Sequence, residues 1–162
     1  MCGIVAVTGY KKALPLLMNG LEKLEYRGYD SAGIAIINSE TNSIICNKAE
    51  GKLKNLINKL NGENIPGTVG IGHTRWATHG KPEVKNAHPH TDSSGNIAVV
   101  QNGIIENFQD LKNKLQKEGI IFNSDTDTEV IPHLIERELK TLSKLNLENN
   151  GCLLYTSPSP RD

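Results

Sequence analysis

Short apolar runs rich in β-branched residues alternate along this chain with segments whose apolar residues recur at helical spacing. The run at residues 3–9 predicts a strand, and the leucines of residues 11–24, three or four positions apart, predict an amphipathic helix packed on it. Residues 32–37 and 43–47 flank an Asn-Ser-Glu-Thr-Asn cluster, which predicts an antiparallel hairpin. This alternation favours an α+β fold of helices layered on sheets over a bundle or an all-β sandwich.

The rest of the chain continues the pattern. We expect a short helix at 53–60, strands at 68–73 and 97–101, and helices at about 106–118 and 128–142. Gly28 and Gly119 are expected to end the helices that precede them, and Asp127 to cap the last one. Residues 77–96 are polar and rich in Gly, Pro and His, which is typical of a long binding loop.

Length and composition restrict the classes of protein. A chain of 162 residues predicts one domain, at 1–150, and residues 151–162 end in a Pro/Ser run that predicts a disordered tail, native or not. Lys plus Arg equals Asp plus Glu, at 18 each, which argues against nucleic acid and anionic membranes as partners. No apolar run approaches the ~20 residues of a membrane helix and no signal peptide is evident, so we expect a cytoplasmic protein.

The cysteines and histidines do not predict a metal site. Cys2, Cys46 and Cys152 are odd in number and lack a C-x-x-C spacing, so neither a disulfide framework nor a zinc site is supported. Four of the five histidines lie between residues 73 and 90, but no carboxylate or cysteine completes a compact ligand set. We therefore expect no metal and no cofactor.

Cys2 becomes the first residue once Met1 is removed, and it then carries a nucleophile and a base together. A free α-amine titrates near ~7.7–8.0, so it can accept a proton at neutral pH and activate the thiol of the same residue. A cysteine at position two is by itself more typical of a small apolar residue at the start of a buried strand. Both interpretations stay open on this residue alone.

Three polar residues invite a comparable choice. Arg75 has a planar fork that suits a carboxylate, or it forms a surface ion pair. Asp127 is a helix cap, or a carboxylate that also binds a cation. Asn102 and Gly103 form a tight turn with positive φ, or present a side-chain NH2 and a backbone N–H to an oxyanion.

Five motifs occur together: MCGIV at the start, LEYRGYDSAG at 24–33, GHTRWATHG at 72–80, VVQNGIIEN at 99–107 and SDTDTE at 124–129. Over residues 1–145 they resemble the glutaminase domain of the glutamine–fructose-6-phosphate aminotransferases, which are class II glutamine amidotransferases. The resemblance implies an N-terminal-nucleophile hydrolase fold, an αββα sandwich of antiparallel sheets, truncated here at its C-terminal side. It also implies absent sugar-isomerase domains, through which alone fructose 6-phosphate would bind, and a homodimeric full-length enzyme.

The resemblance also implies residue roles in the hydrolysis of L-glutamine. Cys2 attacks the side-chain amide and Asn102 with Gly103 binds the oxyanion, while Arg75 holds the α-carboxylate and Asp127 the α-ammonium. The remaining implied residues are Trp76 at the mouth of an ammonia channel, Thr78 and His79 at the substrate, and Arg27 and His88 as supporting residues.

One position departs from the resemblance. The family usually has His before Asn-Gly, whereas this chain has Gln101, which keeps a donor and an acceptor but does not titrate. No acid–base role is therefore expected there. Two alternatives remain: another class II amidotransferase, such as the phosphoribosylamine-forming enzyme, or a catalytically silent fragment of the same fold.

Overall fold

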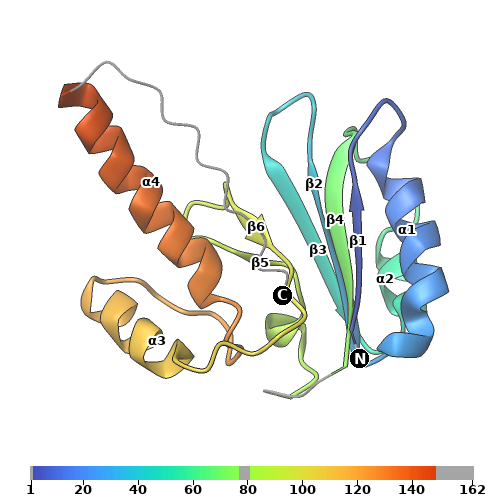
Figure 1. The fold of residues 1–162 in the computed structure, drawn as a ribbon. Helices are drawn as coiled ribbons and strands as arrows, with labels where there is room; N and C mark the ends of the chain where they lie inside the picture. The colour runs from blue at the N-terminus through green and yellow to red at the C-terminus, as the bar shows by residue number, and fades with distance from the viewer. Residues whose placement is uncertain (1, 77–80, 149–162) are drawn as a thin grey trace, which may run out of the picture.

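The computed structural model describes residues 2–76 and 81–148, which form helix, sheet, sheet and helix layers (Figure 1). Helices α1 (Ala13–Leu24) and α2 (Leu53–Lys59) cover one face of a four-stranded sheet. A second, two-stranded sheet lies on the other side of that sheet, and α3 (Phe108–Lys117) and α4 (Val130–Glu148) form the outer layer beyond it. The αββα sandwich of antiparallel sheets that the sequence predicts is confirmed.

The first sheet has the order β1-β4-β2-β3 and is antiparallel throughout. Its strands are β1 (Gly3–Val7), β2 (Ser31–Ile37), β3 (Ile44–Glu50) and β4 (Val69–Arg75). The predicted hairpin is β2 and β3. Because β1 starts opposite the end of β4, with Gly3 paired to Thr74, Cys2 lies beside the residues that follow β4.

The main core lies between the first sheet and the two helices that cover it. Leu17 and Leu21 of α1, Ile34 and Ile36 of β2 and Leu56 of α2 are all completely buried. Burial of one such side chain contributes about 1.5–3 kcal/mol. These contacts fix α1 and the first sheet as the rigid base on which the second layer is built.

Successive residues of β4 point to opposite faces of the first sheet. Gly70 and Gly72 face α1, so His73 and Arg75 point away from α1, toward the second layer. That layer contains a 3₁₀ turn, η2 (Val84–Asn86), and the strands β5 (His90–Thr91) and β6 (Ala98–Val99). The two layers approach closely at Gly33 of β2, where an added Cβ would lie 2.1 Å from the carbonyl oxygen of His88. A side chain at Gly33 would therefore push the second layer away.

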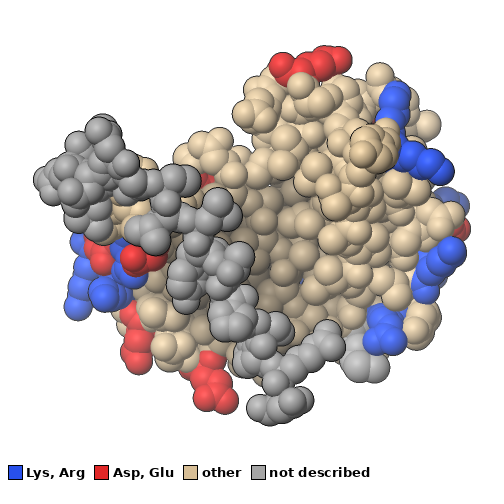
Figure 2. Space-filling model, turned by 45° about the horizontal axis from the view of Figure 1, so that its top comes forward, with Lys and Arg blue, Asp and Glu red and all other residues tan. Residues whose placement is uncertain are grey.

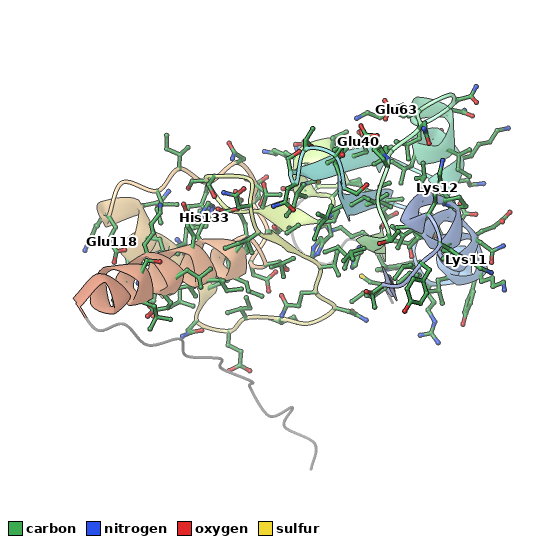
Figure 3. All side chains as sticks on the ribbon, turned by 90° about the horizontal axis from the view of Figure 1, so that it is seen from above. Lys11, Lys12, Glu40, Glu63, Glu118 and His133 are labelled. Atoms are coloured by element: carbon green, nitrogen blue, oxygen red, sulfur yellow. The ribbon has the colours of Figure 1, made fainter. Side chains whose placement is uncertain are left out.

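Glu129, at the start of α4, fixes the segment that leads into this helix. Its carboxylate accepts hydrogen bonds from the N–H groups of Asn123 and Ser124, each at 2.7 Å. Burial alone would raise the pKa of Glu129, but the nearby His133 ring, 3.8 Å away, and hydrogen bonds from Ser124 and these N–H groups outweigh it and lower that pKa to about 2. Figure 3 labels His133 on α4, within the outer helical layer. The fixed segment carries residues 124–128 into the site described below.

The charged side chains are of both signs. On the face shown in Figure 2, Lys and Arg as well as Asp and Glu lie mainly around the margin, and other residues occupy the middle. Across the described residues, no helix is both long and apolar enough to cross a membrane.

Several element limits differ from the sequence-based predictions. Helix α1 ends at Leu24 and is followed by a 3₁₀ turn, η1 (Glu25–Arg27), so Gly28 does not end it directly. Gly28 has extended backbone, and an added Cβ there would lie 2.7 Å from the carbonyl carbon of Arg75, so a close approach explains this glycine. The strand expected at 97–101 shrinks to β6, whereas Gly119 ends α3 with φ +88°, as predicted. The expected tail at 151–162 lies outside the described residues.

Candidate active site

A pocket of about 320 Å³ opens where five distant segments meet: the start of β1, the end of β4, the segment between η2 and β5, the loop after β6 and the segment before α4. The residues that line it are Cys2, Arg75, Trp76, His88, Gln101, Asn102, Gly103, Ile104, Thr126, Asp127 and Thr128. All of the predicted catalytic residues, and both charged residues predicted to bind substrate, are in this set.

Cys2 is half-buried, and backbone and amide groups surround it. The Trp76 N–H donates to Cys2 Sγ at 3.3 Å, and the Asn102 side chain donates from Nδ2 to the Cys2 carbonyl oxygen at 3.5 Å. The first of these bonds places a donor where a thiolate would need one. Since Met1 precedes Cys2 in the sequence, the α-amine becomes free only when Met1 is removed.

Arg75 is 4% exposed and brings a cation to the pocket. Its Nη1 donates to the Lys81 carbonyl oxygen at 3.4 Å. Burial lowers the pKa of the guanidinium, and the neighbouring acidic groups of Cys2, Asp30 and Asp127 oppose that shift, so Arg75 remains a cation at neutral pH. A buried guanidinium of this kind is suited to a carboxylate ligand.

Trp76 follows Arg75 at the rim of the pocket and is 42% exposed. Its ring meets that of Tyr29 edge to face, with centroids 5.3 Å apart and planes at 76°. The backbone of Trp76 can sit there because Gly28 has no side chain, since an added Cβ would lie 2.9 Å from the Trp76 nitrogen. Gly28 of the LEYRGYDSAG motif thus shapes the part of the rim that Trp76 forms.

The tight turn with positive φ, one of the two interpretations of Asn102 and Gly103, does not form, because neither is among the described residues with positive φ. Contacts from distant residues hold their loop instead. The Gln101 N–H donates to His88 Nδ1 at 3.3 Å, and the Ile105 N–H donates to Asp127 Oδ2 at 2.7 Å. The local preference of Asn-Gly is therefore overridden, and the two residues face the pocket in a bend between β6 and α3.

Asp127 lies three residues before α4 and is 6% exposed. Its backbone carbonyl accepts from the Val130 N–H at 3.2 Å, while its carboxylate bonds the distant Ile105 N–H. A cap alone does not explain that carboxylate, which also lines the pocket. Asp127 and Arg75 thus supply one anion and one cation to the same cavity.

Three histidines are packed together beside the pocket. His73 stacks on His88 with centroids 4.3 Å apart, and His90 meets His88 edge to face at 4.7 Å. Burial lowers the pKa of His73 to about 4, that of His90 to about 3 and that of His88 further still. All three are neutral at pH 7, and because His88 Nδ1 accepts from Gln101, its proton is assigned to Nε2.

Some predicted residues lie elsewhere. Arg27 is not among the residues that line the pocket. Its Nε donates to the Tyr26 hydroxyl at 3.0 Å, and its guanidinium lies 5.4 Å from the centroid of the Tyr26 ring. Thr78 and His79 lie outside the described residues. Within the described part, no three His, Cys, Asp or Glu side chains are arranged to hold a metal ion.

Three residues that line the pocket escaped the sequence analysis. Ile104 follows the Asn-Gly pair directly, and Thr126 and Thr128 flank Asp127. Both threonines lie within the SDTDTE motif, and this was the one feature of the sequence that could have identified them as pocket residues. Nothing in the spacing distinguishes a threonine that lines a cavity from one in a turn.

The known proteins that this chain resembles include glutamine amidotransferases and aminotransferases. The family model described as "Glutamine amidotransferase domain" matches residues 42–146. A glutamine–fructose-6-phosphate aminotransferase (isomerizing) of Gloeobacter violaceus is 62% identical over 136 residues, which are 83% of this chain and 22% of that protein. The Aquifex aeolicus protein of the same name is 54% identical over 154 residues, 90% of this chain and 26% of that one.

Two solved structures resemble the fold. Glutamine phosphoribosylpyrophosphate amidotransferase from B. subtilis, complexed with ADP and GMP, matches with a TM-score of 0.69 and 30% identity, over 90% of this chain and 32% of that chain. A structure titled as the allosteric regulatory enzyme of purine biosynthesis matches with a TM-score of 0.72 and 32% identity, over the same shares. This chain spans about a quarter or less of the length of its first curated relatives, with 22% of the Gloeobacter protein as an example.

Proposed function

Because the chain belongs to the glutamine amidotransferase domain family, we propose that Cys2 acts as the nucleophile that releases ammonia from the side-chain amide of L-glutamine. One observation carries the proposal: Cys2 shares a single pocket with a buried cation, a buried anion and the Asn102–Gly103 donors. A pocket of about 320 Å³ has the size expected for a small ligand.

The two charged residues suit the two ends of a free amino acid. Arg75 binds the α-carboxylate through its fork, and Asp127 binds the α-ammonium. The side chain of glutamine then extends toward Cys2. Both charges are already buried before substrate arrives, so the substrate replaces water around groups that are held in place.

The reaction proceeds in two displacements. With Met1 removed, the Cys2 α-amine takes the thiol proton, the thiolate attacks the amide carbon, and Asn102 Nδ2 with the Gly103 N–H stabilises the resulting oxyanion. The C–N bond breaks as the protonated α-amine gives its proton to the leaving ammonia. Water then attacks the thioester, releases glutamate and restores the Cys2 thiol.

The released ammonia needs an acceptor, and the names of the curated relatives suggest one. We propose that in a longer protein this ammonia aminates fructose 6-phosphate, the compound that the names of the curated relatives contain, in sugar-isomerase domains that follow a glutaminase domain at 1–150. The 62% identity to such a relative favours this acceptor over the phosphoribosyl acceptor of structural relatives that are 30% identical. We propose that this longer protein is cytoplasmic, because a reducing compartment keeps a catalytic thiol free. Its assembly as a homodimer is a proposal that rests on the family resemblance alone.

The test is to give L-glutamine to the purified chain, with Met1 removed, and to measure glutamate and ammonia separately. The unsubstituted chain and Cys46→Ala are each expected to release glutamate and ammonia in equal amounts. Cys2→Ala is expected to release neither product. Turnover by Cys2→Ala would overturn the assignment of the nucleophile. Glutamine binding without any product would favour the catalytically silent fragment.

A further inference from the structure

Gln101 makes three contacts that the proposed reaction does not use. Its N–H donates to His88 Nδ1 at 3.3 Å, and its side-chain Oε1 accepts from the Thr128 hydroxyl at 2.9 Å. Its Nε2 lies close to Gly103, two residues further along, because a Cβ added to Gly103 would be 3.1 Å from that atom. The side chain therefore folds back beneath Gly103 while its oxygen reaches the segment before α4.

The loop that contains Asn102 and Gly103 is thus attached at both ends to two consecutive residues. At one end Gln101 accepts from Thr128, and at the other the Ile105 N–H donates to Asp127. Asp127 and Thr128 are 6% and 1% exposed, so the anchoring segment is itself buried. We call the pair of bonds 101–128 and 105–127 the loop clamp.

We infer that Gln101 is a positioning residue that sets the Asn102–Gly103 donors against the substrate-binding Asp127 through its bond to Thr128. This inference rests on the proposed function, in which those donors bind the oxyanion. An oxyanion hole contributes only when its donors are placed before the charge develops. A carboxamide suits the task because it accepts and donates without adding charge beside the developing anion and without titrating near pH 7.

The experiment is a double-mutant cycle with Gln101→Ala and Thr128→Val, in which valine keeps the shape of threonine but lacks its hydroxyl. Values of kcat are expressed per Cys2 that a glutamine-mimicking diazoketone can alkylate, so that partly unfolded protein does not count. Gln101→Ala is expected to lower kcat about three- to tenfold with KM changed less than about twofold, the range for one lost hydrogen bond. The double variant should be no slower than the slower single variant.

Three further variants test specificity. Thr128→Ser, which keeps the hydroxyl, should lose less kcat than Thr128→Val. The exposed Gln109→Ala on α3 and Thr141→Val on α4 are matched controls for each substitution and should leave kcat unchanged. Losses that multiply in the double variant, an unchanged kcat in Gln101→Ala, or a loss that appears only in KM would each overturn the clamp. Failure of the proposed function is distinguishable, because the unsubstituted chain would then release no Cys2-dependent glutamate.

Discussion

At the scale of single residues, the site depends on groups whose chemistry cannot be exchanged for a similar one. Arg75 and Asn102 illustrate two different uses of a hydrogen-bond donor. Arg75 is a buried guanidinium, suited to a charge that the substrate carries throughout the reaction. Asn102 lines the same pocket beside Cys2, where negative charge would appear only in the transition state. Their substitutions should therefore affect different kinetic constants.

Arg75→Lys is expected to raise KM for glutamine about tenfold or more with a smaller change in kcat, because an ammonium cannot form the two parallel bonds of a guanidinium. Steady-state kinetics measures both constants. The control is Arg137→Lys, at a partly exposed arginine on α4 that pairs with Glu118 and Glu138. An unchanged KM in Arg75→Lys would contradict the proposal that Arg75 binds the α-carboxylate of glutamine.

Asn102→Ala is expected to lower kcat about 10²–10³-fold, the usual effect of removing one oxyanion donor, with KM changed only slightly. The exposed Asn58→Ala on α2 serves as the matched control. If Asn102→Ala instead raised KM and left kcat unchanged, Asn102 would be a ground-state binding residue.

At the scale of elements, the local patterns were good predictors wherever local contacts decide the structure. The leucine spacing located α1, and the polar cluster between two apolar runs located the β2–β3 hairpin. The sequence predicted the conformation of Asn102–Gly103 and the length of β6 less well. The Asn102–Gly103 loop depends on a partner far along the chain, Asp127, and no local pattern contains that information. Strand β6 pairs with the two residues of β5, and the apolar run that predicted the strand does not show where this pairing ends.

Gly33 links the first sheet to the second layer. Gly33→Ala is expected to destabilise the fold by about 1–3 kcal/mol, the usual cost of overpacking, because the new Cβ would meet the His88 carbonyl oxygen at 2.1 Å. It should also lower glutaminase activity, since His88 lines the pocket. Urea unfolding measures the free energy, with Ile37→Ala at the 40% exposed end of the same strand as a milder control. Unchanged stability in Gly33→Ala would contradict the close approach of the two layers.

At the scale of the whole molecule, the buried histidines link stability to pH. The folded-state pKa of His73 is about 4 and that of His90 about 3, both below the ordinary value of about 6.5. The unfolded chain therefore takes up protons that the folded chain excludes as the pH falls below about 6.5. The stability from these residues is present above that pH and is lost as the pH falls toward their folded values.

Each of these histidines should contribute a slope of about 1.4 kcal/mol per pH unit within that window. Urea unfolding at pH 7.5, 6.0 and 5.0 measures the total, and the variant His90→Gln should show a smaller slope. Carboxylates whose pKa is lowered in the folded state, such as Glu129, also stabilise the fold. That stabilisation is lost only at lower pH, because the ordinary pKa of a carboxylate is about 4. Stability that stays constant between pH 7 and pH 5 would show that the histidines are not buried as described.

The proposed reaction depends above all on Cys2, which attacks glutamine in this pocket with the help of its own free α-amine. The most direct measurement is peptide mass spectrometry after treatment with 6-diazo-5-oxo-L-norleucine, a glutamine mimic that alkylates the attacking nucleophile. A single adduct is expected on Cys2, in a peptide that begins at Cys2 because Met1 is absent, together with protection by excess L-glutamine. An adduct on Cys46, or an unmodified Cys2 in chain that lacks Met1, would contradict it.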